Sequence, residues 1–206
     1  DVVTIQTTSG LVPNVWVSNV DQNHAYPTET MTNWQTGWDL TTVDADPYVG
    51  HWSGLDLDSN DNVHISYYDD YNDHLKYAFY DGTSWTISTI DTNTAGGYST
   101  LVVDTNDHIH VAYSDPVNQE LKYAYHDGNS WAISVVGHAV PDSGWPNTGI
   151  GSYQGGGYDN SFSIAVDSNN NPHISYFNLV SLVNGNPELL YSSFDGVSWT
   201  TTSVDS

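Results

Sequence analysis

The chain contains no cysteine and no arginine, and only two of its 206 residues are lysines. The absence of cysteine excludes disulfides, thiolate catalysis and cysteine-ligated zinc. The absence of arginine excludes an arginine clamp on a carboxylate or phosphate ligand. Because 25 acidic residues give a formal net charge of −23, the sequence also excludes nucleic acid and anionic membrane as partners, since both are bound through Lys and Arg.

Long hydrophobic runs are missing as well. No apolar stretch approaches the roughly 18 residues that a membrane span needs, and no basic segment followed by an apolar one marks a signal peptide. The sequence therefore predicts no membrane insertion. The abundant Tyr, Trp, Asn, Ser, Thr, Gly and Asp are typical of secreted proteins, so we expect an extracellular or cell-surface location, with Asp1 as a mature N-terminus after processing.

What the chain does contain is one motif repeated three times. It reads LDLDSNDNVHISYYD from Leu55, LVVDTNDHIHVAYSD from Leu101 and SIAVDSNNNPHISYF from Ser163, and each copy continues into a D-G-x-S-W segment. A period of about 46 residues indicates a repeat architecture. Residues that recur in phase are therefore expected to belong to the scaffold.

Each repeat carries four short segments with strand character, separated by turn residues. In the first clear unit the expected strands are Leu55–Leu57, His64–Tyr68, Leu75–Tyr80 and Trp85–Ile90. Asp and Asn fill the first turn, and Asp81-Gly82 is typical of a tight hairpin. One such unit cannot bury both of its faces, so copies must stack. The predicted fold class is all-β, a four-bladed β-propeller of four-stranded antiparallel repeats.

The first 44 residues are interpreted as an eroded fourth copy. Thr8 precedes Asn14 by the same six residues that separate Asp from His in the clear repeats, and Trp38 precedes Asp44 by six. Its expected strands are Val2–Thr7, Val15–Asn19, Thr30–Trp34 and Trp38–Val43. The single predicted domain, 1–206, then has blades at 1–44, 45–91, 92–137 and 158–206, with an insertion at 138–157.

The blade pattern resembles the propeller repeats of the secreted sialidase-like and Asp-box superfamily and of fucose-binding propeller lectins. The segments that carry the resemblance are S-L-x-x-D-x-N-x-x-H-I-S-Y, L-K-Y-A and D-G-x-S-W. The last is one residue shorter than an Asp box, so the likeness concerns architecture. Sialidases of this superfamily bind the substrate carboxylate through three arginines, and their absence here excludes that activity.

Two recurring sets of residues invite a metal interpretation. His64, His110 and His173 fall on three different blades, so we expect hydrogen-bonded histidines between blades and no shared metal site. The Asp and Asn residues of the first turn of each repeat present oxygen ligands at alternate positions, as calcium prefers. These candidate calcium ligands are Asp58, Asn60, Asp104, Asn106, Asp167 and Asn169. Turn structure alone also accounts for them, and we expect no required cofactor.

The residues that break the repeat are the candidates for binding. The segment 138–160, which includes the insertion, carries Trp145, Tyr153 and Tyr158, and other connections between repeats carry Tyr48, His51, Trp52 and Tyr98. We expect these aromatic loops to surround the channel mouth. Aromatic faces beside Asp, Asn and Gln suit a neutral sugar, because rings stack on its C–H faces while amides and carboxylates bond its hydroxyls.

Three functions remain open on this basis. The leading one is non-enzymatic, lectin-like binding of a glycan. The second is a structural or adhesive module that associates through the strand edges of its end blades, with a surface protein or a second copy as the partner. The third is a hydrolase that uses two carboxylates, which would need one carboxyl with a raised pKa in a pocket.

Overall fold

The structure is a computed structural model that describes residues 6–7, 10–11, 41–92, 98–115, 118, 120–138, 162–178 and 188–205. The chain divides into two units, Asp1–Thr42 and Val43–Ser206. In the first unit, β1 (Gln6–Thr7) and β2 (Gly10–Leu11) form a short antiparallel hairpin. Strand β1 falls in an expected strand, but β2 occupies an expected turn. The predicted strand Trp38–Val43 was also wrong, because the described residues 41–43 have no strand structure.

The second unit consists of three four-stranded antiparallel sheets in which spatial order follows chain order. The first sheet contains β3 (Val49–Leu57), β4 (Val63–Asp69), β5 (His74–Tyr80) and β6 (Trp85–Asp91). The second contains β7 (Ser99–Val103), β8 (Ile109–Asp115), β9 (Glu120–His126) and β10 (Trp131–His138). The third contains β11 (Phe162–Val166), β12 (Pro172–Asn178), β13 (Glu188–Phe194) and β14 (Trp199–Asp205). The four-stranded repeat is confirmed three times; the predicted fourth blade lies mostly outside the described residues.

No helix occurs in the described ranges, and none there could therefore cross a membrane.

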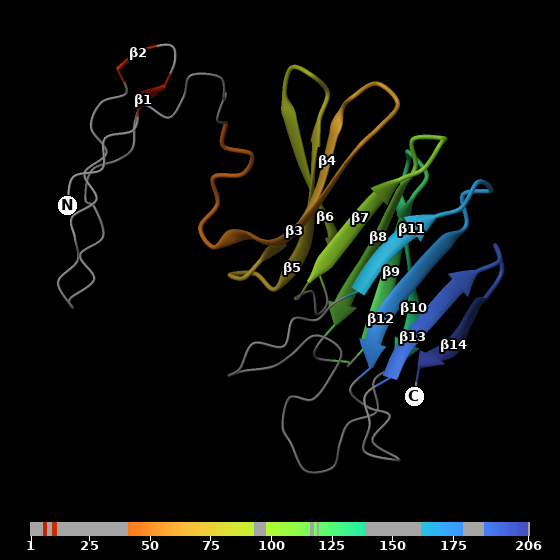
Figure 1. Ribbon diagram of the computed structural model, residues 1–206. Helices are drawn as coiled ribbons and strands as arrows, with labels where there is room; N and C mark the ends of the chain where they lie inside the picture. Colours follow the sequence, from red (N-terminus) through yellow and green to blue (C-terminus); the bar gives the residue numbers. More distant parts are fainter. Residues whose placement is uncertain are drawn as a thin grey trace. The chain divides into compact units, whose positions relative to one another are not determined.

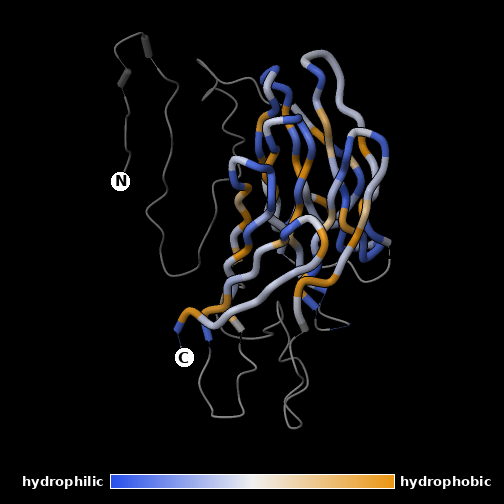
Figure 2. The backbone as a smooth tube through the Cα atoms, turned by 90° about the vertical axis from the view of Figure 1, so that its right-hand side faces the viewer, coloured by the Kyte–Doolittle hydropathy of each residue, from blue (hydrophilic) through white to orange (hydrophobic). Residues whose placement is uncertain are grey.

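The strands arise from local patterns. Each repeat alternates large apolar and small or polar residues, as Figure 2 shows along the strands. The D-G hairpins end them in the same way each time, with Gly82, Gly128 and Gly196 in the left-handed region at φ +89°, +90° and +92°. Asp81 accepts the backbone N–H groups of Thr83 and Ser84 and fixes the turn.

The sheets stack face to face in the order of the chain (Figure 1). Tyr77 and Leu75 of the first sheet pack against Leu101 and Val111 of the second. A second apolar cluster joins the second and third sheets. The first strands of neighbouring sheets come very close at Gly54, where an added Cβ would lie 2.9 Å from the backbone nitrogen of Leu101. Glycine is therefore required there for packing.

Both lysines of the chain have largely buried side chains, at equivalent positions of the first and second sheets, and each is paired with two carboxylates. At the first–second junction, Lys122 Nζ lies 2.7 Å from Asp115 Oδ2 and 3.4 Å from Asp91 Oδ2. Tyr113 donates its hydroxyl to the same Asp91 oxygen at 2.7 Å. One lysine thus offsets part of the charge of two buried carboxylates, and the hydroxyl of Tyr113 adds a hydrogen bond to one of them.

The equivalent lysine of the first sheet has the same kind of partner. Lys76 Nζ lies 2.6 Å from Asp44 Oδ2, which also accepts the hydroxyl of Tyr67 at 2.7 Å. Asp44 therefore takes the place that Asp91 takes one repeat later. At the second–third junction Gly137 and Leu190 replace the Asp and the Lys.

Candidate ligand-binding sites

Each recurring histidine bonds a tyrosine of its own sheet, and His64 and His110 are buried while His173 is partly exposed. His64 Nδ1 lies 2.5 Å from the hydroxyl of Tyr77, and His110 Nδ1 lies 2.7 Å from that of Tyr123. His110 Nε2 lies 3.3 Å from Asp104 Oδ2. The prediction that these histidines bond between blades was wrong, since both rings of each pair belong to one sheet. In both of these sheets the Tyr follows the His by 13 residues, a constant spacing that the sequence already contained.

Two of the recurring tryptophans, Trp131 and Trp199, in contrast connect neighbouring sheets. Trp131 meets Tyr77 of the preceding sheet edge to face, with ring centroids 5.3 Å apart. Trp199 meets Tyr123 in the same way at 5.1 Å. Both indole rings are partly buried and pack against the apolar clusters of the junctions, so they have a scaffold role.

The Asp- and Asn-rich turns join neighbouring sheets. Ser59 donates its backbone N–H and its hydroxyl to the carboxylate of Asp107, both at 2.8 Å. One junction later, Thr105 donates its hydroxyl to Asn170 Oδ1 at 2.9 Å. Asp107 and Asn170 have φ angles of 62° and 64°, which Asp and Asn tolerate better than other non-glycine residues. The turns therefore have a structural role.

The candidate calcium ligands lie in these turns. Asp58 Oδ1 accepts the backbone N–H groups of Asn60 and Asn62, and its Oδ2 accepts the carboxamide of Asn62. In the same manner, Oδ1 of Asp104 and Oδ1 of Asp167 each accept two backbone N–H groups of their own turns. In the described part of the chain no group of three or more His, Cys, Asp or Glu side chains could hold a metal ion. Calcium in one or more of these turns stays a prediction.

Three of the aromatic residues predicted for binding come together at one end of the first and second sheets. Trp52 lies between neighbours, with ring centroids 5.0 Å from Tyr98, 5.6 Å from Tyr68 and 5.5 Å from His51. His51 Nδ1 lies 2.5 Å from Asp70 Oδ2. We call His51, Trp52, Tyr68 and Tyr98 the ring cluster. The sequence analysis did not select Tyr68, because it lies in an expected strand of the repeat and not in a connection.

The ring cluster sits on strained backbone. His51 and Trp52 belong to β3, not to a loop as predicted, and β3 is bulged between Val49 and His51 and between His51 and Gly54. Trp52 has φ 49° and Tyr48 has φ 62°, and such left-handed non-glycine residues gather at functional sites. Trp52 is 41% exposed. Tyr48 is exposed but has no ring contact in the cluster. Trp145, Tyr153 and Tyr158 lie outside the described residues.

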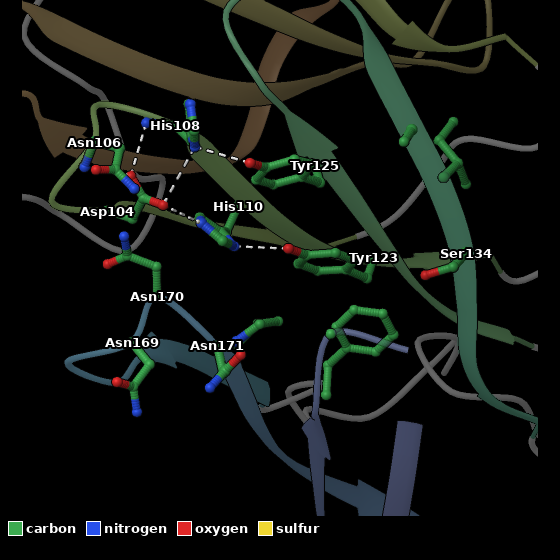
Figure 3. A pocket seen from close by; sticks show the side chains of 15 residues that line it. Asp104, Asn106, His108, His110, Tyr123, Tyr125, Ser134, Asn169, Asn170 and Asn171 are labelled. Atoms are coloured by element: carbon green, nitrogen blue, oxygen red, sulfur yellow. Dashed lines mark hydrogen bonds and ion pairs between the residues drawn. The ribbon is translucent and has the colours of Figure 1, made fainter. Parts of the chain in front are cut away.

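A groove that the sequence did not predict lies at the opposite end of the strands, between the second and third sheets (Figure 3). Its volume is about 530 Å³, which is within the range of small-molecule sites. One wall is the second sheet with the turn that precedes β8; the other is the turn that precedes β12 and the β13–β14 hairpin. Its lining residues are Asp104, Asn106, His108, His110, Tyr123, Tyr125, Ala132, Ile133, Ser134, Asn169, Asn170, Asn171, Pro172, Phe194 and Gly196.

The groove offers neutral hydrogen-bonding groups around a fixed polar centre. Asp104 Oδ2 lies 3.6 Å from His108 Nδ1 as well as close to His110, and Tyr125 bonds His108 at 2.8 Å. Asn106 and Asn169 are among the lining residues, and no hydrogen bond of their carboxamides is found within the described residues. They can therefore both donate to and accept from a ligand.

Electrostatics keep this centre in its ordinary ionisation state. Burial acts to raise the pKa of Asp104, but hydrogen bonds from the backbone of His108 and Asn106 and from His110 lower it overall. Backbone donation from Asn171 lowers the pKa of Asp167 to about 2. Burial lowers the pKa of His110, so the imidazole is neutral near pH 7. Neither carboxyl resembles the proton donor that a hydrolase would need.

No protein-family model matches the chain, and no curated protein matches it. Solved structures with a similar arrangement include a fucose lectin from Kordia zhangzhouensis in complex with methyl-fucoside. It is 15% identical over 75% of this chain and 99% of that chain, with a TM-score of 0.46.

A mutant of the Aleuria aurantia lectin is similar to a comparable degree. Its complex with α-methyl-L-fucoside is 19% identical over 74% of this chain and 44% of that chain, with a TM-score of 0.49. The complex with Fucα1-6GlcNAc gives 19% identity, 74% and 45% coverage and a TM-score of 0.48. The chain thus spans less than half of that lectin. A likeness of this degree transfers no residue role.

Proposed function

We propose that the protein binds a neutral carbohydrate without catalysing a reaction on it, and that the carbohydrate binds in the groove between the second and third sheets. The observation that carries this is a cavity of about 530 Å³ with two unengaged carboxamides, Asn106 and Asn169, beside the rings of Tyr125 and Phe194. Amides suit sugar hydroxyls, and ring faces suit sugar C–H groups. Neither lysine lines the groove, so a ligand with a carboxylate or phosphate would be repelled.

The ring cluster is a second contact surface for the same class of ligand. Trp52 is exposed, and Asp70 and Asp73 lie beside it through their bonds to His51 and Tyr68. Because the cluster lies at the other end of the strands, a single small sugar cannot touch both places. The aromatic residues of 138–157, with Trp145, belong to this proposal as predicted ligands. An extracellular or cell-surface location accords with a glycan ligand.

Calorimetric titration with a panel of methyl glycosides tests the proposal, and it includes neutral hexosides, a fucoside and an anionic uronide. We expect a neutral glycoside to bind and the uronide to fail. Asn169→Ala should weaken binding about five- to tenfold, the value of roughly 1 kcal/mol for one hydrogen bond. Trp52→Ala removes the central ring of the ring cluster and leaves the groove unchanged, so its affinity shows whether the ring cluster contributes to binding.

Val197→Ala is the matched control, because Val197 is 87% exposed on the β13–β14 turn and lines neither surface. Its affinity should equal that of the unaltered protein. If no glycoside binds at millimolar concentration, or if the three variants bind equally, the proposal fails. The runner-up function, a structural module, is favoured by a different observation, the uncovered face of the third sheet.

A further inference from the structure

The face of the third sheet that points away from the second sheet is apolar and open. Phe177 and Leu189 are direct cross-strand neighbours on it and are 38% and 43% exposed. Val204 lies at the β-bulge opposite Leu189 and is 60% exposed. We call these three residues the open face. Contiguous exposed apolar side chains are typical of interaction surfaces, whereas single ones are not.

The same positions are buried in the other two sheets. Leu189 corresponds to Leu75 and Leu121, which are 2% and 0% exposed. Val204 corresponds to Ile90 and Val136, each 7% exposed, and those two residues lie at the same bulge. In each case the next sheet covers them. The open face therefore has the composition of a junction whose second half is missing.

The missing half is present at the other end of the unit. Leu55 of the first sheet is 60% exposed, whereas its counterparts Leu101 and Ile164 are 6% and 8% exposed because each packs on the preceding sheet. Leu57, two residues along β3, is 46% exposed. The first sheet thus presents the surface that the second and third sheets use to cover their predecessors.

Within the described residues, the hydrogen bonds that join neighbouring turns at a junction are not formed at the outer turns of the first and third sheets. Ser59 and Thr105 donate to Asp107 and Asn170 of the following turn. Their counterpart in the third sheet is Ser168, which is exposed and has no such acceptor among the described residues. The counterpart of the acceptors in the first sheet is Asp61, with the same left-handed φ of 62° and no donor there.

We propose that these two ends bind each other between two copies of the chain, head to tail. The open face of one copy covers Leu55 and Leu57 of the next, and Ser168 donates to Asp61 across the interface. One existing contact changes in the process. The incoming Asp205, the counterpart of Asp91, approaches Lys76, which Asp44 and Asp46 contact in the free chain. This proposal is independent of carbohydrate binding.

Charge sets the conditions of the test. Two copies with a formal charge of −23 repel each other, and salt at about 0.15 M reduces that repulsion to a range of roughly 8 Å. We therefore expect the mass of the full chain, measured by light scattering or sedimentation, to rise above that of a monomer with concentration, and more so with added salt.

Substitutions at each end make the test specific. Leu189→Ser removes part of the open face and Leu55→Ser removes part of its complement; each should weaken association at least tenfold. Mixing the two variants should restore a dimer, because the Leu189→Ser copy keeps an intact first sheet and the Leu55→Ser copy keeps an intact third sheet. Val197→Ser, on the exposed β13–β14 turn, is the control and should associate normally.

A disulfide experiment checks the register in a chain that has no cysteine of its own. The double variant Ser168→Cys, Asp61→Cys should form a covalent dimer or ring under oxidation, while each single variant should not form the same product efficiently. A strictly monomeric chain in screened salt overturns the proposal. So does a mixture of the Leu variants that stays monomeric, or a disulfide that closes only within one copy, although each variant is folded by circular dichroism.

Discussion

The Cβ atom that Gly137 lacks would lie 2.8 Å from the hydroxyl oxygen of Tyr176. Gly137 holds the repeat position of Asp91, whose carboxylate accepts the hydroxyl of Tyr113 one junction earlier. At the second–third junction the tyrosine hydroxyl therefore occupies the space of the missing carboxylate side chain. The two junctions solve the same packing problem with different pairs of residues.

The first prediction follows from that distance. Gly137→Ala should destabilise the fold by about 1–3 kcal/mol, because the interior there cannot take an extra methyl group. Adding Tyr176→Phe removes the oxygen and leaves the ring carbon at 3.7 Å as the nearest contact, so the double variant should regain most of the loss. Urea unfolding measures both changes. Equal stability of Gly137→Ala and the double variant contradicts the prediction.

The second prediction concerns the buried lysine of the second sheet. Lys122→Met should cost about 3 kcal/mol, because it leaves the carboxylates of Asp91 and Asp115 buried without their cation. The third repeat carries Gly137, Asn178 and Leu190 at the corresponding positions. Copying that set as Asp91→Gly, Asp115→Asn and Lys122→Leu should therefore cost less than the single change.

Thermal unfolding at fixed pH compares these variants. If the triple variant is the less stable one, the ion pairs contribute more than a matched apolar junction can replace, and our account of the third repeat is wrong. Lys76→Met provides the parallel measurement at the preceding position, where Asp44 is the partner.

The repeat period and most strand boundaries could be predicted because they depend on local chemistry. The strand expected at Trp85–Ile90 is β6, Trp85–Asp91, since a D-G turn precedes it and its alternation is regular. Trp52 shows where local chemistry fails. It was assigned to a loop, but the bulges of β3 extend the strand through it, and such bulges depend on packing against the next strand.

The groove could not be predicted for a related reason. Its two walls meet through Thr105 and Asn170, which are 65 residues apart in sequence. Their proximity follows from the direction in which the sheets stack, and a repeat pattern alone does not give that direction. The pairing of His110 with Tyr123 could have been found, because the same spacing of 13 residues occurs in the first sheet.

The third prediction tests the aromatic contact between sheets. Trp199 lies edge to face on Tyr123 and donates its indole N–H to Ser134 Oγ at 3.2 Å. Trp199→Ala should lower the free energy of unfolding by about 3 kcal/mol, the low end for a large aromatic side chain, since Trp199 is only half-buried. Val197→Ala, two residues away and exposed, should change it by less than about 0.5 kcal/mol.

Chemical denaturation measures both variants under the same conditions. An equal effect of the two substitutions would show that the ring adds nothing beyond surface area, and the scaffold role assigned to the repeated tryptophans would be wrong.

The fourth prediction concerns pH. Burial lowers the pKa of His64 and His110, even though Asp58 and Asp104 act to raise it. In the unfolded chain these histidines titrate near 6.5, so below that pH the unfolded state binds more protons than the native state, and the free energy of unfolding falls. Asp58 and Asp104 have lowered pKa values in the native state, so their contribution is lost only below about pH 4.

The two effects therefore separate by pH window. Stability should decline between about pH 6.5 and pH 5, where the carboxyl groups stay ionised and only histidines gain protons. The double variant His64→Gln, His110→Gln should be less stable at pH 8 but should show a flatter profile across that window. Urea midpoints at pH 8, 6.5 and 5 give the slope. An unchanged slope in the double variant would mean that groups other than His64 and His110 govern the acid response.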